Sequence, residues 1–75
     1  MDTKAAGRCV AFGMTYKKNY EAKARAILAT AAQTGEGPLV AQSVREALDE
    51  LDAINRAGKD QYPWVSRAID ACNQF

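Results

Sequence analysis

Alanine dominates the apolar part of this chain, and this limits the kind of core that the chain can build. Of the 75 residues 48% are apolar, but 15 of these are alanine, and leucine, isoleucine, valine and phenylalanine together contribute 13. Alanine has the highest helix propensity and little surface to bury, so the composition favours helices around a thin core. A chain of this size buries only about 60% of its unfolded surface. We therefore expect one small domain, residues 1–75, that needs stabilisation from outside its own core.

Small domains usually obtain such stabilisation from a metal, from disulfides or from association with another chain. This chain has no histidine, and Cys9 and Cys72 lie near its opposite ends without a second pair to complete a zinc site. A single bridge between them is the alternative, but the chain starts without a signal-like pattern. We therefore predict reduced, buried thiols in a cytoplasmic protein. We therefore expect no cofactor and no metal. Association with a second copy remains as the source of stabilisation, so we expect a homodimer.

Glycine and proline divide the chain into a lead segment and three helices. Apolar or small side chains recur at three- and four-residue steps within 18–34, 38–57 and 63–74, which predicts a helix in each range. Gly35 is expected to end the first helix in the left-handed conformation, and Pro38 to lie in the first turn of the second. The inner stripe of the second helix is predicted to be Val40, Val44, Ala47, Leu48, Leu51 and Ile54.

The lead segment, residues 1–15, fits two structures. Val10, Phe12 and Met14 alternate with small residues as in a strand, whereas Gly13 and the alanines argue against one. Strand and helix both stay open at this point. The predicted fold class is mainly α: a three-helix small domain with an N-terminal extended segment, in a dimer.

Charge separates along the chain. Residues 1–25 contain six basic and two acidic side chains, whereas residues 36–52 contain one basic and five acidic ones. The total is close to neutral, with a formal net charge of +1. Such polarity suits association between the basic end of one copy and the acidic helix of another, or binding of an acidic partner by the N-terminal end. Two solvated faces are the simpler interpretation.

Groups that could carry catalysis are scarce, and we predict no enzymatic activity. The absence of histidine removes an imidazole base, and Ser43 and Ser66 lie on predicted helices without a lysine placed to activate them. Glu46, Asp49 and Glu50 share a helix face but lack the glycine-containing loop of a calcium site. The uncharged run from residue 26 to 35 is too short to cross a bilayer, and we expect no membrane association.

One cluster mixes tyrosines with positive charges at the start of the first predicted helix. Such a mixture can contact an acidic protein surface or pair with phosphates and stack on bases. Tyr16 and Tyr20 are four residues apart, so packing of both into the core is the alternative. Trp64 is likewise either a binding anchor, together with Phe75, or a core residue. The candidate partner-binding residues are Arg8, Tyr16, Lys17, Lys18, Tyr20, Lys23, Arg25 and Trp64.

The order of elements resembles that of the ribbon-helix-helix DNA-binding repressors. The resemblance rests on the alternating segment from Val10 to Met14, a helix to Gln33, a glycine-containing turn and a helix from Leu39. It implies that two strands pair across a dimer and present side chains to the major groove. In this sequence the two strand faces would be Arg8, Val10, Phe12 and Met14, or Cys9, Ala11, Gly13 and Thr15.

Three functions follow from these observations. The first is a small non-enzymatic interaction protein, an inhibitor, adaptor or regulator that binds a protein partner, as is frequent among phage and mobile-element proteins. The second is a dimeric DNA-binding transcriptional regulator that uses the same basic end. The third is capture of an anionic nucleotide between two copies. We favour the first, because a compact chain without cofactors offers mainly its surface.

Overall fold

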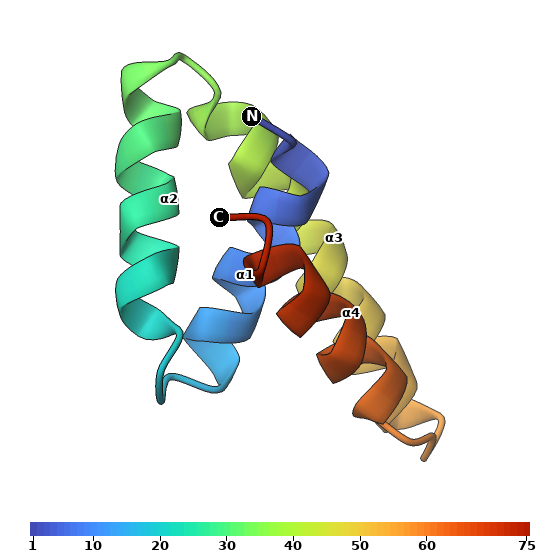
Figure 1. Cartoon of the computed structure of the whole chain (residues 1–75). Helices are drawn as coiled ribbons and strands as arrows, with labels where there is room; N and C mark the ends of the chain where they lie inside the picture. Colours follow the sequence, from blue (N-terminus) through green and yellow to red (C-terminus); the bar gives the residue numbers. More distant parts are fainter.

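The computed structural model describes all 75 residues and contains four helices and no strand (Figure 1). The helices are α1 (Thr3–Thr15), α2 (Glu21–Gln33), α3 (Gly37–Arg56) and α4 (Tyr62–Cys72). α1 lies in the middle and packs against the other three, while α2 stands to one side and packs mainly on α1. The prediction of a mainly α domain is confirmed, whereas the prediction of three helices is wrong by one.

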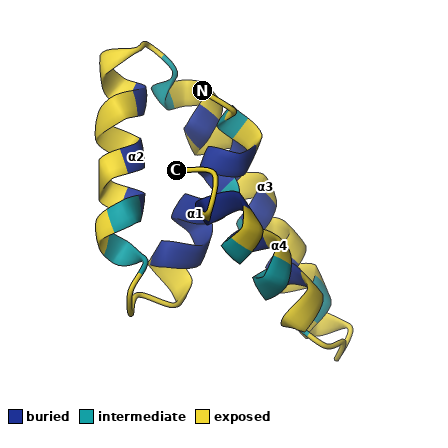
Figure 2. Cartoon of the chain, in the orientation of Figure 1, coloured by how far each residue is buried: buried dark blue, intermediate teal, exposed yellow.

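The additional helix is the lead segment, so the extended alternative for residues 1–15 is wrong. The side chain of Asp2 caps α1 by accepting hydrogen bonds from the backbone N–H groups of Lys4 and Ala5, both at 3.1 Å. Residues 9–13 are all buried, because α1 is covered on several sides (Figure 2). A helix buried all round carries apolar residues on every face, so the alternation of Val10, Phe12 and Met14 does not indicate a strand here.

Two glycines let the neighbouring helices approach α1 closely. A Cβ atom added to Gly7 would lie 2.2 Å from Cβ of Ser43 on α3, and one added to Gly13 would lie 2.8 Å from Cβ of Ala24 on α2. The hydroxyl of Ser43 also donates a hydrogen bond to the carbonyl oxygen of Lys4, at 3.1 Å. Gly7 and Gly13, the second of which argued against a strand in the sequence, are therefore the contact points of α1.

The other helices differ from their predicted ranges by at most three residues at either end. Gly35 ends the α2 segment with φ at 75°, and the backbone N–H of Glu36 donates to the carbonyl oxygen of Ala31 at 2.9 Å. Pro38 lies in the first turn of α3, as predicted. α2 begins later than predicted because Asn19 adopts a left-handed φ of 70°, which interrupts a helix.

The core lies along α1. Four of the six residues in the predicted stripe of α3 are buried, and Leu48 and Ile54 are half-buried against them. Trp64 of α4 fills the space between α4 and α3, where its Nε1–H donates to the carbonyl oxygen of Ala47 at 2.9 Å. α2 contributes only three buried residues, namely Ala24, Ile27 and Ala31.

Cys9 and Cys72 form a disulfide between α1 and the end of α4, with their Cα atoms 4.7 Å apart. The predicted burial of both is confirmed, since neither has exposed surface, but the predicted reduced state is wrong. α4 returns alongside α1 and so brings together two residues 63 positions apart. Nothing in a single sequence with two cysteines shows such an approach.

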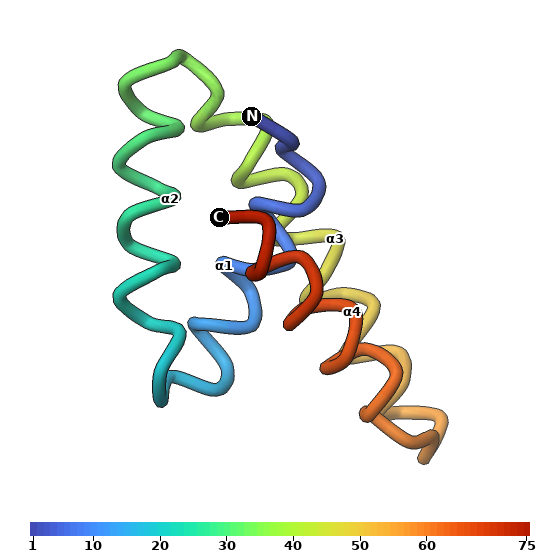
Figure 3. Tube along the Cα trace, in the orientation of Figure 1, coloured from blue at the N-terminus to red at the C-terminus, as the bar shows by residue number.

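The chain measures 39 × 23 × 16 Å along its principal axes. Both ends of the trace turn toward α2 (Figure 3), and Met1 and Phe75 line one groove beside that helix. None of the four helices combines the length and the apolar character that crossing a bilayer requires.

Candidate partner-binding surface

The turn between α1 and α2 presents positive charge to solvent. α1 ends where the backbone N–H of Tyr16 donates to the carbonyl oxygen of Phe12, and the chain reverses through residues 17–20. The carbonyl oxygen of Lys17 accepts from the N–H groups of Tyr20 and Glu21, at 3.3 and 3.1 Å. With the backbone held in this way, the side chains of Lys17 and Lys18 are exposed.

Beside this turn the surface is hollowed between α1 and α2, over a volume of about 300 Å³. We call this feature the α1–α2 hollow. The close approach of Gly13 to Ala24 forms its floor, and Met14 and Leu28 line it while being 54% and 43% exposed. The charged lining residues are Lys17, Glu21 and Arg25. The result is an apolar depression with a mainly basic edge.

Most of this positive charge is not neutralised within the chain. Lys17 and Lys18 take part in none of the four ion pairs. Arg25 pairs with Glu21, at 2.7 Å between Nη2 and Oε1, but the Arg25 side chain is 77% exposed and that of Glu21 is 44% exposed. An exposed pair of this spacing contributes only about 0.3–0.5 kcal/mol, so an incoming carboxylate can replace it at little cost.

The two tyrosines of the candidate set pack against Phe12 next to the hollow. The ring of Tyr20 packs edge-on against Phe12, with centroids 4.8 Å apart, and the ring of Tyr16 lies 5.2 Å from Phe12. The hydroxyl of Tyr16 donates to Oε1 of Gln61 at 2.6 Å. Tyr20 is half-buried, whereas Tyr16 keeps an exposed edge beside Lys17.

Three candidate residues lie elsewhere. Trp64 is only 3% exposed, so the expectation that part of it faces a partner is wrong. Arg8 is half-buried and lines a separate depression with Arg67 and Asp70, between α1 and α4. Lys23 points to the other flank of α2, where its Nζ donates to the carbonyl oxygen of Cys72 and to a terminal oxygen of Phe75. Of the predicted set, the structure places Lys17 and Arg25 on the hollow itself, Lys18 in the adjoining turn, and Tyr16 and Tyr20 against Phe12 beside it.

Met14 and Leu28 are the residues of this surface that the sequence did not identify. Both belong to apolar patterns, and periodicity alone assigns such residues to the interior. α2 packs mainly on α1 and only weakly on the other helices, so no element covers Met14 and Leu28 at the junction of α1 and α2. Their exposure follows from the arrangement of three helices, which no local pattern encodes.

Glu36, at the turn between α2 and α3, has a lowered pKa. The hydroxyl of Thr34 donates to its carboxylate at 2.6 Å, and the ammonium of Met1 lies 3.1 Å away. These two contacts, the first being the stronger, lower the pKa of Glu36 below its ordinary value of 4.5. The carboxylate closes the turn rather than serving a site.

The structure holds no group of three or more His, Cys, Asp or Glu side chains arranged to bind a metal ion. No protein-family model, no curated protein and no solved structure matches this chain.

Proposed function

We propose that this chain is a non-enzymatic protein-interaction module that binds an acidic protein segment at the α1–α2 hollow. It would act as an inhibitor, adaptor or regulator by covering or bridging that partner. The single observation that carries the proposal is that exposed Met14 and Leu28 line the hollow together with Lys17, which lacks a counter-charge. Apolar contact supplies affinity at such a surface, and charge supplies orientation and rate.

The size and charge of the hollow indicate what kind of partner segment it can bind. A hollow of about 300 Å³ accepts one or two apolar side chains, and Lys17 and Arg25 on its edge then meet carboxylates beside them, with Lys18 exposed in the adjoining turn. An amphipathic segment with Asp or Glu flanking a leucine or an aromatic residue fits this description. The partner side chain would anchor in the hollow, as central apolar residues do in most interfaces.

The disulfide changes the compartment that we propose. The sequence favours a cytoplasmic protein on the premise that its cysteines are reduced, and that premise does not hold. Structural disulfides persist in oxidising compartments and are rare in the cytosol. We therefore place the protein, with its partner, in an oxidising environment.

A charge-reversal pair of variants tests the site. The patch variant carries Lys17→Glu, Lys18→Glu and Arg25→Glu, and the control variant carries Arg45→Glu, Arg56→Glu and Lys59→Glu at exposed positions away from the hollow. Both change the net charge equally. Each protein is incubated with an extract from an oxidising compartment and crosslinked to what it binds. We expect the wild type and the control variant to crosslink to the same proteins, and the patch variant to crosslink to none of them.

A photo-crosslinking residue at position 28 makes the assay specific for the hollow, because Leu28 is the apolar contact that we assign. Circular dichroism must show the same helix content in all variants. Retention of the same crosslinked proteins by the patch variant would disprove the site. Loss from the patch and the control variants alike would show that only overall charge matters.

Two sequence-based alternatives change in the light of the fold. The ribbon-helix-helix resemblance requires a strand in residues 8–15, and this segment is part of α1. Without a ribbon we do not propose DNA binding.

Homodimerisation was expected partly because the core is thin, and the disulfide now supplies part of that stabilisation. The remaining support for a dimer is charge complementarity. The acidic side chains of α3 are exposed and complement the basic edge of the α1–α2 hollow of another copy.

Sedimentation equilibrium separates self-association from binding of another protein. If a second copy occupies the hollow, the wild type and the control variant will sediment as dimers and the patch variant as a monomer. If the partner is a different protein, all three will sediment as monomers.

A further inference from the structure

The turn between α1 and α2 offers two adjacent basic residues outside any helix. Of the ten lysines and arginines, three lie outside the helices, namely Lys17, Lys18 and Lys59. Exposed turns are preferred sites of proteolysis, because helical backbone is hydrogen-bonded and cannot extend into a protease. Lys17 and Lys18 are exposed and belong to none of the four ion pairs. Both are therefore free to enter the acidic pocket with which trypsin-like proteases bind a basic side chain.

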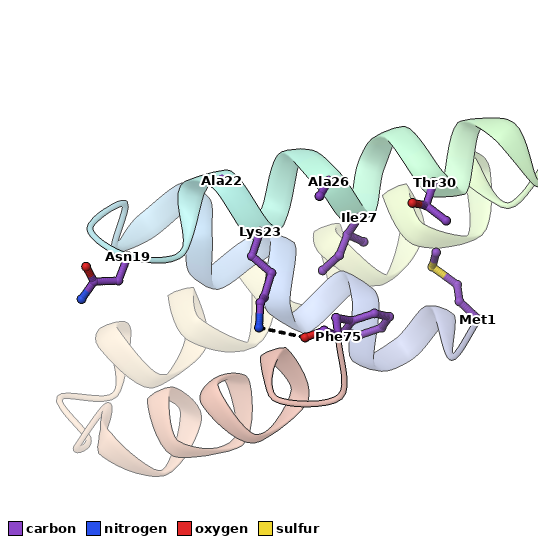
Figure 4. Close-up of a pocket in the computed structure, with 8 residues that line it drawn as sticks. All are labelled: Met1, Asn19, Ala22, Lys23, Ala26, Ile27, Thr30 and Phe75. Atoms are coloured by element: carbon purple, nitrogen blue, oxygen red, sulfur yellow. Dashed lines mark hydrogen bonds between the residues drawn. The ribbon is translucent and has the colours of Figure 1, made fainter.

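Few hydrogen bonds hold the backbone of this turn. The N–H groups of Lys17, Lys18 and Asn19 make no backbone hydrogen bond. The carbonyl oxygen of Lys17 accepts two, from Tyr20 and Glu21, whereas that of Lys18 accepts none. Asn19 has a φ of 70°, which is uncommon for a residue with a side chain, and its side chain points away from the helices (Figure 4). The bond between Lys18 and Asn19 is therefore the one that can extend at the least cost.

The turn between α3 and α4 contains the third basic residue, and it is held more firmly. The N–H of Lys59 donates to the carbonyl oxygen of Ile54 at 3.0 Å. Asp60 follows directly, and its carboxylate accepts from the N–H of Tyr62 at 3.0 Å. A pocket that is acidic in order to bind lysine repels a neighbouring carboxylate. We therefore expect Lys59 to be a poor site although its side chain is exposed.

Cleavage requires only the start of α2 to open. The ring of Tyr20 must leave Phe12, and the two hydrogen bonds to the carbonyl oxygen of Lys17 must break. α2 resists this weakly, since it has three buried residues and packs mainly on α1. A segment with few buried contacts opens at a lower free energy than the whole fold. Global unfolding is therefore not needed for a protease to reach the turn.

We propose that an endoprotease specific for basic residues hydrolyses the bond between Lys18 and Asn19 in the folded protein. One water is consumed: the carbonyl carbon of Lys18 receives the hydroxyl, and the nitrogen of Asn19 receives the proton. At neutral pH the new carboxyl group then gives up its proton and the new amine accepts one. The inference does not depend on the function proposed for the α1–α2 hollow.

The disulfide keeps the two products together. The piece before the cut contains Cys9 and the piece after it contains Cys72, so both stay covalently joined. α1 also keeps its packing against α3 and α4, which the cut does not touch. The product is a two-chain molecule rather than a pair of separate fragments.

α2 also stays attached near its new end. Lys23, in the first turn of α2, donates from Nζ to the carbonyl oxygen of Cys72 at 3.2 Å and to a terminal oxygen of Phe75 at 2.9 Å (Figure 4). These bonds join α2 to the end of the chain independently of the turn. We therefore expect the cut to release residues 19–22 and to leave the rest of α2 in place.

Limited digestion of the oxidised protein with trypsin, followed by mass spectrometry, tests the site. The first product should have gained one water, and reduction should split it into residues 1–18 and 19–75. The turn variant Lys17→Gln, Lys18→Gln should be cut in this turn about a hundredfold more slowly or less, because a pocket built for a cation rejects a neutral side chain. The control variant Arg56→Gln, Lys59→Gln removes the same charge around the other turn and should be cut within about twofold of the wild-type rate. A first cut at any other bond, or equal slowing in the control, would overturn the proposal.

The dependence of the cutting rate on urea shows whether the folded protein is the substrate. Opening of the turn exposes little surface, so the rate should change little at low urea concentrations. Cutting through global unfolding would instead rise with the full urea dependence of the unfolding free energy. Circular dichroism of the cut, unreduced protein should show the helix content of the intact one. A rate that follows global unfolding, or loss of the helices in the cut form, would disprove cleavage to a folded two-chain molecule.

Discussion

At the scale of single residues, Glu36 couples the α2–α3 turn to the start of the chain. Its carboxylate accepts a hydrogen bond from Thr34 and faces the ammonium of Met1, and these contacts lower its pKa. A carboxyl group whose pKa is lower in the folded state than in the unfolded state stabilises the fold above its unfolded pKa, near 4.5. This contribution disappears as the pH falls through the folded pKa.

We therefore predict that Glu36→Gln is less stable than the wild type at pH 7 and that the difference shrinks as the pH falls below about 4.5. Urea unfolding at a series of pH values measures it. Glu46→Gln serves as the control, because Glu46 is exposed and belongs to no ion pair. A difference between Glu36→Gln and the wild type that stays constant with pH would contradict the assigned cause.

At the scale of helices, the crossing of α1 and α3 depends on the absence of one side chain. A Cβ atom at residue 7 would lie 2.2 Å from both Cβ and Oγ of Ser43, and 2.7 Å from its backbone carbonyl carbon. A rotamer change of Ser43 cannot relieve the backbone contact, so the helices must separate. We predict that Gly7→Ala destabilises the fold by about 1–3 kcal/mol, although alanine favours helices.

Gly37→Ala is the matched control for this prediction. Gly37 begins α3 with no atom within 4 Å of an added Cβ, so alanine should be neutral there or stabilise by up to about 1 kcal/mol. Thermal or urea unfolding of both variants measures the contrast. If Gly7→Ala is as stable as Gly37→Ala, α1 and α3 do not cross as closely as described.

The same scale shows what a sequence can and cannot predict. α3 was predictable because its stripe faces one side only, so its period is visible in the letters. α1 was not, because it is buried on several sides and its glycines serve close packing. Lys17 and Arg25, which line the hollow, belong to the basic cluster that the sequence singled out, whereas its apolar floor depends on how α2 packs on α1. Local pattern predicts elements, but contacts between elements determine which apolar residues stay exposed.

At the scale of the whole molecule, the disulfide offsets the thin core. Chains of this size have a total stability of roughly 4–11 kcal/mol, from about 0.05–0.15 kcal/mol per residue. Closing a loop between residues 63 positions apart contributes about 4 kcal/mol in the chain-entropy model. The crosslink thus accounts for a large share of the total.

We predict that the double variant Cys9→Ala, Cys72→Ala loses about 3–4 kcal/mol of unfolding free energy and is partly unfolded at 37 °C. The wild type with both thiols reduced and kept reduced is the essential comparison, because it loses the crosslink and keeps both sulfur atoms. If reduction alone costs as much as the double substitution, the crosslink is the cause. If the reduced wild type is as stable as the oxidised one, the crosslink contributes little. The lower stability of the double variant then comes from lost packing of the Cys9 and Cys72 side chains, which are both fully buried. In that case the fold would not need the bond, and its stability would not require an oxidising compartment.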